Sequence, residues 1–410
     1  MKPLLIVLGL LLTRFALTAN PLMVCESCPI RDIQRAIEMA NPGDEVRVLA
    51  GEYAISTLNI DKRLRLIGEG MPILRGNKKD ELLIITADSV EIIGIEFRDA
   101  GKSNLKDLAA IRVRGRKGFV IQSNRIMDAY FGIYIEKGKQ GLIADNVLIG
   151  QAVDEMSSGN AIHAWDAKQL RIVGNEVRGY RDGIYLEFVN ESEIRDNISV
   201  ENIRYGLHFM FSNDDSYTCN LFRDNGAGVA VMFSKRIEMR YNRFEHNWGR
   251  SSYGLLLKEI YDAEIEHNTF DKNTIGILLE GSTRLNYRFN EFRANGWAVQ
   301  MSGGCLDNNF SFNDFLYNSN DLVINGRVNN NTFDNNYWSS YSGYDLDRDG
   351  AGDVAYRPVK LYSYIQSQAP ESIILMRSFF IDLLNFSEKV SPVFTPENVL
   401  DHRPLINRVL

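Results

Sequence analysis

The feature that most constrains the fold of this chain is an internal repeat of about 22 residues. An asparagine recurs, usually with an apolar residue two positions later, and from position 175 onward successive asparagines lie 22, 23, 22, 26, 22 and 23 residues apart. Between them runs a second motif, a small residue followed by apolar residues at alternate positions, as in GIYLE (183–187) and GLHFM (206–210). Short β-type runs at this period, without a helical stripe, predict an all-β chain folded as a right-handed parallel β-helix, with one coil per repeat.

The asparagines are predicted to lie at a corner of each coil, where their amides can hydrogen-bond along the stack. Two intervals are longer than the rest, 29 residues between Asn146 and Asn175 and 26 between Asn242 and Asn268. We expect the extra residues, AVDEMSSGN (152–160) and NWGRSSY (247–253), to form loops that protrude from their coils.

The first residues predict an exported protein. Lys2 precedes an apolar run at 3–12 that is too short to span a bilayer, and the small residues Ala16 and Ala19 follow. This is the pattern of a cleaved secretory signal over residues 1–19, which places the mature chain in a bacterial periplasm. The net charge of −7 and the lack of a long basic run exclude nucleic acid as an expected partner.

The repeat also divides the rest of the chain. An N-terminal segment and cap helix are predicted at 20–43, because Ile33, Ala36, Ile37 and Ala40 have helical spacing and Asn41-Pro42-Gly43 ends the pattern. The β-helix follows at 44–340, then an acidic loop region at 341–369 and a C-terminal helix and tail at 370–410. The helix is predicted at Ser372–Glu388, an apolar segment too short to cross a bilayer, and we expect it to dock on a membrane-embedded partner. We also expect the solenoid to fold without residues 370–410.

The second motif fixes which side chains face outward. Residues one and three positions after the small residue are uniformly apolar and must face the interior, so those two and four positions after it face outward. Two positions after it lie Tyr134, His163, Tyr185, His208, Ala230, Leu256 and Leu278. Four positions after it lie Glu136, Trp165, Glu187, Met210, Met232, Lys258 and Glu280.

These columns predict a metal site on the outer face. Met232 lies one coil after Met210, roughly 4.8 Å away, and His208 lies beside them. Glu187 is one coil before Met210, and His163 is two coils before His208. Thioether sulfur with imidazole suits copper, especially Cu(I). We therefore predict copper ligands at His208, Met210 and Met232, with His163 and Glu187 as secondary ligands.

The same columns also fit an apolar docking surface for a partner. Trp165, Tyr185, Leu256 and Leu278, together with the two methionines, would form a larger exposed apolar patch than a soluble protein normally carries. The copper site and the docking surface are compatible.

Two further motifs are candidate metal or disulfide sites. Cys25 and Cys28 form a CESC pair that predicts either a disulfide loop or a copper site. The stretch DLDRDGAGD has the acidic spacing of the first part of a calcium loop, with the turn glycine at position 6 but Tyr356 in place of glutamate at position 12. Its candidate calcium ligands are Asp345, Asp347, Asp349 and Asp353.

A parallel β-helix also invites an enzymatic interpretation. Glycoside hydrolysis needs two carboxyl groups about 5–10 Å apart. Glu136 and Glu187 share a column, but they lie two coils apart with Trp165 between them. We predict that the chain is not an enzyme, and we keep a carbohydrate-binding or polysaccharide-cleaving β-helix as the alternative.

Several stretches of the chain resemble the NosD family, periplasmic copper-binding proteins that serve the maturation of nitrous oxide reductase. They include RDGIYLEFV (181–189), RYGLHFMFSN (204–213), GAGVAVMFSK (226–235) and NYWSSYSGYDLDRDGAGDVAYRPV (336–359). His208, Met210 and Met232 lie within motifs of the family, and His163 lies in a variant where Ala161 replaces the usual glycine.

The resemblance implies a β-helix that works with the membrane and ATPase subunits of an ABC transporter. It also implies that copper arrives from a lipoprotein chaperone and leaves for nitrous oxide reductase. The protein would then be held at the inner membrane through these partners.

Overall fold

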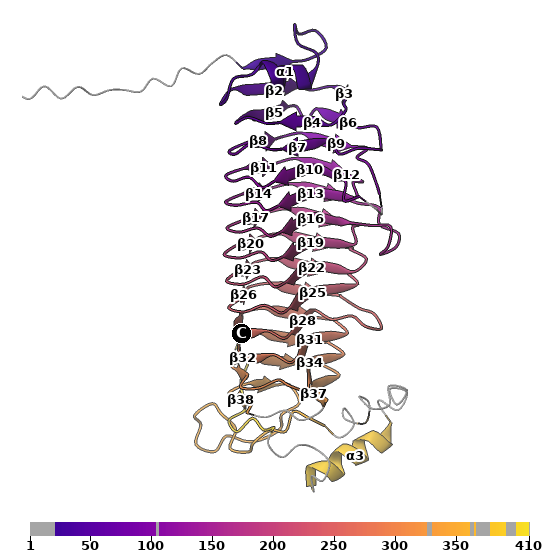
Figure 1. Ribbon diagram of the computed structural model, residues 1–410. Helices are drawn as coiled ribbons and strands as arrows, with labels where there is room; N and C mark the ends of the chain where they lie inside the picture. Colours follow the sequence, from indigo (N-terminus) through magenta and orange to yellow (C-terminus); the bar gives the residue numbers. More distant parts are fainter. Residues whose placement is uncertain are drawn as a thin grey trace, which may run out of the picture.

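The computed structural model describes residues 21–103, 106–325, 330–360, 365, 378–390 and 399–409. The chain winds into a parallel β-helix in which most coils contribute one short strand to each of three sheets (Figure 1). The predicted all-β solenoid is therefore confirmed. The predicted export signal at 1–19 lies outside the described residues, and none of the helices within them is long and apolar enough to cross a membrane.

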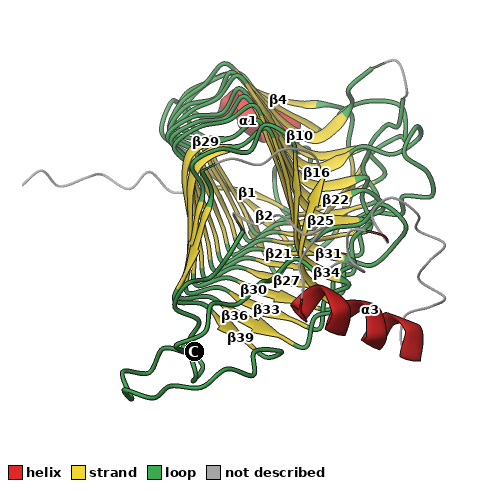
Figure 2. Cartoon of the chain, turned by 90° about the horizontal axis from the view of Figure 1, so that it is seen from below, coloured by secondary structure: helices red, strands yellow, loops and turns green. Residues whose placement is uncertain are grey.

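The three sheets run the length of the solenoid and enclose its core (Figure 2). The 14-stranded sheet consists of β1 (Leu22–Val24), β2 (Glu45–Leu49), β5 (Arg65–Glu69), β8 (Glu91–Ile93), β11 (Val120–Gln122), β14 (Leu142–Ala144), β17 (Arg171–Val173), β20 (Glu193–Arg195), β23 (Ser216–Thr218), β26 (Glu238–Arg240), β29 (Tyr261–Glu266), β32 (Thr283–Arg288), β35 (Asn309–Ser311) and β38 (Thr332–Asp334). The 13-stranded sheet consists of β3 (Glu52–Ala54), β6 (Ile73–Arg75), β9 (Glu96–Arg98), β12 (Arg125–Met127), β15 (Val147–Ile149), β18 (Glu176–Arg178), β21 (Ile198–Val200), β24 (Leu221–Arg223), β27 (Arg243–Glu245), β30 (Thr269–Asp271), β33 (Glu291–Arg293), β36 (Asp314–Leu316) and β39 (Tyr337–Trp338).

The 12-stranded sheet carries the outward columns that the sequence singles out. It consists of β4 (Leu58–Ile60), β7 (Leu83–Ile85), β10 (Ala109–Arg114), β13 (Phe131–Glu136), β16 (Asn160–Trp165), β19 (Asp182–Glu187), β22 (Tyr205–Met210), β25 (Ala227–Met232), β28 (Leu255–Lys258), β31 (Ile275–Glu280), β34 (Trp297–Ser302) and β37 (Asn320–Asn325). The small residue of each repeat lies where a side chain does not fit. A Cβ atom on Gly206 would stand 2.8 Å from the carbonyl oxygen of Gly228 in the next coil.

Asparagine ladders hold the coils in register. Asn220 is typical, since its Nδ2 donates to the Oδ1 of Asn242 at 3.0 Å and to the carbonyl oxygen of Ile194 at 2.9 Å. This ladder runs through the predicted corner positions from Asn124 to Asn336. A second ladder, which the repeat pattern did not reveal, runs from Asn202 to Asn318. Buried amides are thereby satisfied by their counterparts in neighbouring coils.

The N-terminal end is capped as predicted. Helix α1 (Ile33–Met39) begins after Asp32, whose side chain accepts a hydrogen bond from the backbone N–H of Arg35 at 2.7 Å. Ile33, Ala36 and Ile37 are buried against the first strands. The helix therefore covers the apolar core at this end of the stack (Figure 1).

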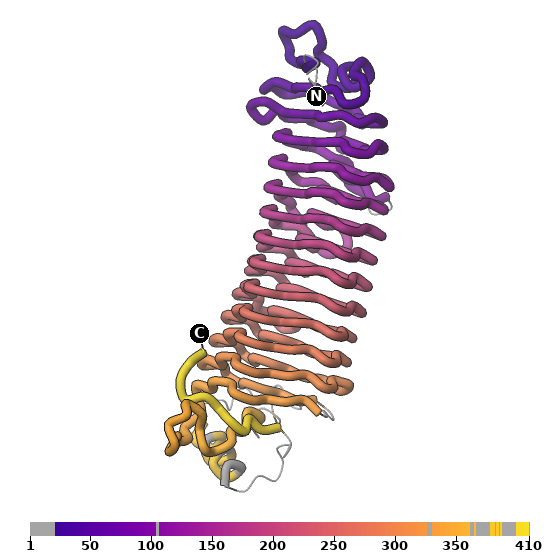
Figure 3. The backbone as a smooth tube through the Cα atoms, turned by 90° about the vertical axis from the view of Figure 1, so that its left-hand side faces the viewer, coloured from indigo at the N-terminus to yellow at the C-terminus, as the bar shows by residue number. Residues whose placement is uncertain are grey.

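The C-terminal end is capped by residues 399–409, which lie along the last coils (Figure 3). Asp401 is fully buried and takes the place of the next ladder asparagine, accepting hydrogen bonds from the backbone N–H and Nδ2 of Asn336. Farther along the tail, Arg408 pairs with Glu291 at 2.7 Å and with Asp314 at 3.2 Å. These buried contacts close the end of the core, so they argue against the expectation that the whole of residues 370–410 is dispensable for folding, which stays a prediction.

Helix α3 (Phe379–Val390) lies within the predicted C-terminal helical region. Residues 372–377 of the predicted helix lie outside the described residues. Phe379, Phe380, Leu383 and Phe386 are exposed on α3, whereas Ile381 is buried. The helix therefore presents an apolar face to its surroundings.

Candidate metal site on the outer face

The strand register brings the predicted copper ligands into neighbouring coils. Met210 of β22 pairs with Met232 of β25, and Glu187 of β19 pairs with Met210. His208 pairs with Tyr185, which in turn pairs with His163 of β16. His163 therefore lies two coils from His208, as the repeat predicts.

Strand alternation turns His208 and Met210 to the outer side, because Leu207 and Phe209 are fully buried in the core. The outer side is nevertheless not bare at His208, which is only 6% exposed. The rings of Tyr185 and Tyr205 each lie 4.9 Å from the imidazole, measured between ring centroids. Aromatic side chains therefore cover His208 on the outside of the sheet. The predicted exposed apolar surface is wrong at Leu256, which is only 6% exposed.

The imidazole of His208 is chemically unsatisfied. Both of its ring nitrogens are buried, and neither has a hydrogen-bond partner among the described residues. Burial, with smaller contributions from the charges of Arg204 and Arg181, lowers the pKa of His208 to about 4 against the opposing effect of Asp182. The ring is therefore neutral at pH 7 and offers a free lone pair, a state that costs about 1–3 kcal/mol unless a ligand satisfies it.

The two thioethers complete a soft donor set. Met210 and Met232 are half-buried, and each is the last residue of its strand. The hydroxyl of Tyr185 donates to the Sδ of Met210 at 3.9 Å. Met232 packs against a small outer cluster that includes Ala230, Tyr253 and Leu256. One imidazole nitrogen and two thioether sulfurs are ligands that favour Cu(I) over hard cations.

His163 differs from His208 because its lone pair is engaged. The Nδ2 of Asn160 donates to the Nδ1 of His163 at 3.0 Å, and the Nη2 of Arg181 holds the Oδ1 of the same asparagine at 3.1 Å. Burial, together with the neighbouring charges of Arg181 and Arg112, lowers the pKa of His163 to about 3. The ring of Tyr185 lies between the two imidazoles, with centroid distances of 4.8 and 4.9 Å. Tyr185 therefore separates the imidazole of His163 from that of His208.

Cys25 and Cys28 form a disulfide, with their Cα atoms 5.0 Å apart. Their sulfurs are bonded to each other ahead of α1, near the N-terminal end of the solenoid. The disulfide alternative is therefore the one that the structure contains.

The acidic loop brings together three of its four predicted calcium ligands. Carboxylate oxygens of Asp345, Asp347 and Asp349 lie within 4.8 Å of one another, and the chain turns at Gly350 with a φ of +91°. Asp353 is not part of this group, and its Oδ2 accepts a hydrogen bond from the backbone N–H of Leu346 at 2.7 Å. Calcium binding at this loop stays a prediction.

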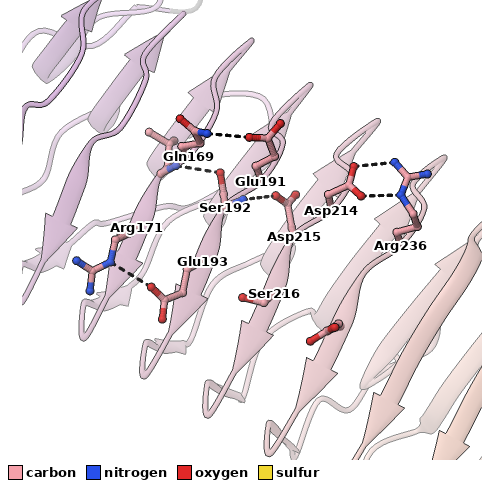
Figure 4. A pocket seen from close by; sticks show the side chains of 11 residues that line it. Gln169, Arg171, Glu191, Ser192, Glu193, Asp214, Asp215, Ser216 and Arg236 are labelled. Carbon is pink, nitrogen blue, oxygen red and sulfur yellow. Dashed lines mark hydrogen bonds and ion pairs between the residues drawn. The ribbon is translucent and has the colours of Figure 1, made fainter.

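A shallow groove of about 730 Å³, which was not predicted from the repeat pattern, lies beside the 14-stranded sheet (Figure 4). Some of its charged side chains form ion pairs across coils. Glu193 accepts from Arg171 at 3.1 Å, and Asp214 forms two hydrogen bonds with Arg236. Asp215 is almost fully buried and accepts from the backbone N–H of Ser192 at 2.8 Å. The carboxylates that line the groove are thus engaged in ion pairs or hydrogen bonds.

Comparison with known proteins identifies similar chains. Residues 149–343 match a family model described as periplasmic copper-binding protein (NosD). The probable ABC transporter binding protein NosD of Pseudomonas aeruginosa is 31% identical over 382 residues, which cover 87% of each chain. Its counterpart in Stutzerimonas stutzeri is 27% identical over 380 residues, covering 88% of this chain and 86% of that one.

Among solved structures, the A-module of the mannuronan C-5 epimerase AlgE6 from Azotobacter vinelandii has a similar fold. Its TM-score is 0.63 at 14% identity, and the match covers 76% of this chain and 95% of the epimerase module. At this identity the likeness extends to the fold alone.

Proposed function

The chain belongs to the NosD family of periplasmic copper-binding proteins, and we propose that it carries Cu(I) on His208, Met210 and Met232. The observation that supports this most directly is the buried imidazole of His208, whose two nitrogens lack partners beside a pair of stacked thioethers. Copper is the cargo of such a site, held for a time and then released.

The donor set suits transient binding. Neutral thioethers bind Cu(I) without adding charge and without having to lose a proton, and the lowered pKa of His208 makes proton loss unnecessary there too. The O–H···S contact from Tyr185 orients the sulfur of Met210. The carboxylate of Glu187, one coil away, can add a negative charge near the metal. His163 is a less suitable ligand in this arrangement, since Asn160 occupies its Nδ1.

In the wider function that we propose, the protein is a non-enzymatic accessory factor for the assembly of the copper sites of nitrous oxide reductase. It would receive copper from a lipoprotein chaperone and act with an ABC transporter, in keeping with the names of its relatives. The exposed apolar face of α3 is the surface we propose for the membrane subunit of that transporter. The export signal and the family together support a location in the periplasm at the inner membrane.

The double variant Met210→Leu/Met232→Leu tests the copper site. Leucine keeps the apolar volume, so the outer cluster around Met232 should stay packed. We expect anaerobic competition with bathocuproine disulfonate to show Cu(I) affinity reduced by at least about tenfold, since two of three ligands are gone. The matched control is Met156→Leu, which removes an exposed thioether from the protruding loop.

Two outcomes would contradict the proposal. Parental Cu(I) affinity in the double variant would leave the methionines as packing residues only. An equal loss in the Met156→Leu control would show that copper binds exposed thioethers without selecting this site. In either case, measuring the affinity of a Cys25→Ser/Cys28→Ser variant under reducing conditions would test the cysteine pair as the copper site.

A further inference from the structure

The corner that follows β19, β22 and β25 carries a stack of phenylalanines on the surface. Phe188, Phe211 and Phe233 lie in successive coils with adjacent ring centroids 5.1 Å apart in both pairs. Phe188 is 44% exposed and Phe211 is 37% exposed. The three rings directly follow Glu187, Met210 and Met232 in the chain, so they border the proposed copper site.

These phenylalanines occupy positions that do not favour them. Their φ angles are +54°, +50° and +55°, in the left-handed region where glycine, asparagine and aspartate are the preferred residues. In the coils on either side, the same corner position holds Asp166 and Glu259. The change from polar residues to phenylalanines therefore falls on the two coils that carry the methionines and on the coil before them, which carries Glu187.

Aromatic stacking at a left-handed corner is not by itself a sign of a partner. A second stack, at a different corner, contains Tyr241, His267, Phe289 and Phe312 with similar spacings. Stacking between coils accounts for both sets in energetic terms. What distinguishes the first stack is its contact with the methionine coils and the charge beside it.

That charge comes from a column of lysines two residues further along the same corner. Lys117, Lys139 and Lys168 follow one another in successive coils through parallel bridges, so their Cα atoms are spaced by roughly 4.8 Å. All three are exposed, and in the described part of the chain none of them forms an ion pair. The next coil continues the column with Asn190, beside Phe188. A row of unpaired positive charges on a chain of net charge −7 is complementary to an acidic surface.

We propose that this corner is the docking surface for a copper-carrying protein. The apolar surface around the partner's metal packs on Phe188, Phe211 and Phe233, and acidic residues beside it meet the lysine column. The inference rests on the proposed function, because the partner places its copper next to Met210 and Met232. Apolar contact around the metal excludes water while Cu(I) exchanges one set of soft ligands for another.

The test replaces the three phenylalanines with asparagine. Asparagine tolerates the left-handed region better than phenylalanine, so the fold should be retained and the loss confined to the surface. The matched control is Tyr241→Asn/Phe289→Asn/Phe312→Asn in the second stack, which changes the same kind of corner away from the methionines. The probe is the soluble part of the copper-chaperone lipoprotein from the same organism, loaded with Cu(I).

Two quantities are measured, the rate of Cu(I) transfer from the chaperone and the equilibrium affinity for Cu(I) against bathocuproine disulfonate. In the phenylalanine variant we expect transfer to slow by at least about tenfold, with affinity within about twofold of the parent. The control variant should match the parent in both. A separate variant, Lys117→Gln/Lys139→Gln/Lys168→Gln, should weaken the salt dependence of the transfer rate.

Transfer at the parental rate in the phenylalanine variant would overturn the docking surface while leaving the copper site intact. Equal slowing in the control stack would also overturn it. In the Met210→Leu/Met232→Leu variant, a loss of Cu(I) affinity with normal docking of the chaperone supports both proposals. Parental Cu(I) affinity in that variant refutes the copper site alone. Binding of alginate that depends on the lysines but not on the phenylalanines would assign the column to an acidic polysaccharide and remove it from this surface.

Discussion

Replacing Asp401 with alanine should open the C-terminal end of the solenoid. The Oδ2 of Asp401 accepts hydrogen bonds from the backbone N–H of Asn336 at 3.0 Å, from its Nδ2 at 3.1 Å and from the Nε1 of Trp338 at 2.9 Å. Asp401, Asn336 and Trp338 are all buried. The substitution therefore strands three donors where water does not reach them.

The size of the effect follows from those contacts. An unsatisfied buried donor costs about 1–3 kcal/mol, so three of them destabilise the last coil by at least about 3 kcal/mol. Asp401→Asn should behave differently, because its side-chain carbonyl can still accept these bonds, as the ladder asparagines do. Burial raises the pKa of Asp401, so the neutral amide avoids the cost of burying a charge. We expect the asparagine variant to lose less than about 1 kcal/mol.

Amide hydrogen exchange of peptides covering β36 to β39 measures this directly. A loss of about 3 kcal/mol in the opening free energy corresponds to exchange roughly a hundredfold faster in the alanine variant. Peptides from β19 to β25 serve as an internal reference that should not change. Unchanged exchange near Trp338 in Asp401→Ala would refute the cap. Equal acceleration in Asp401→Asn would show that the ionised carboxylate, and not its acceptor geometry, holds the end.

Three further regions of the molecule can be tested by substitution or replacement. Burial raises the pKa of Asp215 well above the usual carboxyl range, so its ionisation opposes folding at neutral pH. Asp215→Asn should therefore raise the urea midpoint at pH 7. The gain should shrink as pH falls below the raised pKa of Asp215 and be absent below about 3.9. If the acidic loop binds calcium, added calcium should raise the melting temperature of the parent but not of Asp347→Asn/Asp349→Asn. No calcium effect in the parent would contradict that prediction. Finally, replacing residues 361–398 with a short Gly/Ser linker removes α3 but keeps the antiparallel pairing of Tyr356 with Asp401. This variant should fold yet fail to co-purify with the transporter, and retained co-purification would place docking on the coils instead.

The fold could be predicted because the same pattern, a corner asparagine followed by alternating apolar residues, recurs from coil to coil. The intervals between Asn175 and Asn313 fix the coil length, and the apolar columns fix the faces. The cap helix was predictable for a similar reason, since Ile33, Ala36 and Ile37 need an apolar surface to cover. The role of Asp401 was not predictable, because it completes the ladder from a position 65 residues after Asn336. No periodic pattern connects residues so far apart in sequence.

The candidate site could be predicted in its positions but not in its environment. Alternation correctly turned His208 and Met210 outward, yet it carries no information on what covers an outward side chain. Tyr205, which lies before the small residue of its repeat, shields His208, and Asn160 occupies the lone pair of His163. These contacts depend on irregular residues at the start of each strand, where the repeat is weakest.

In a parallel β-helix, the residues that specify the fold are different from the residues that specify the site. The ladder asparagines and the inner aromatic stack, such as Phe244 on Phe270 at 4.6 Å, recur from coil to coil and fix the position of every corner. On such a frame, any departure from the repeat on the outer face creates a local surface without disturbing the fold. Thioethers in two neighbouring coils and phenylalanines in three are such departures, and they fall together. Residues that differ from their counterparts at the same position in other coils are therefore the ones that should carry function in this chain.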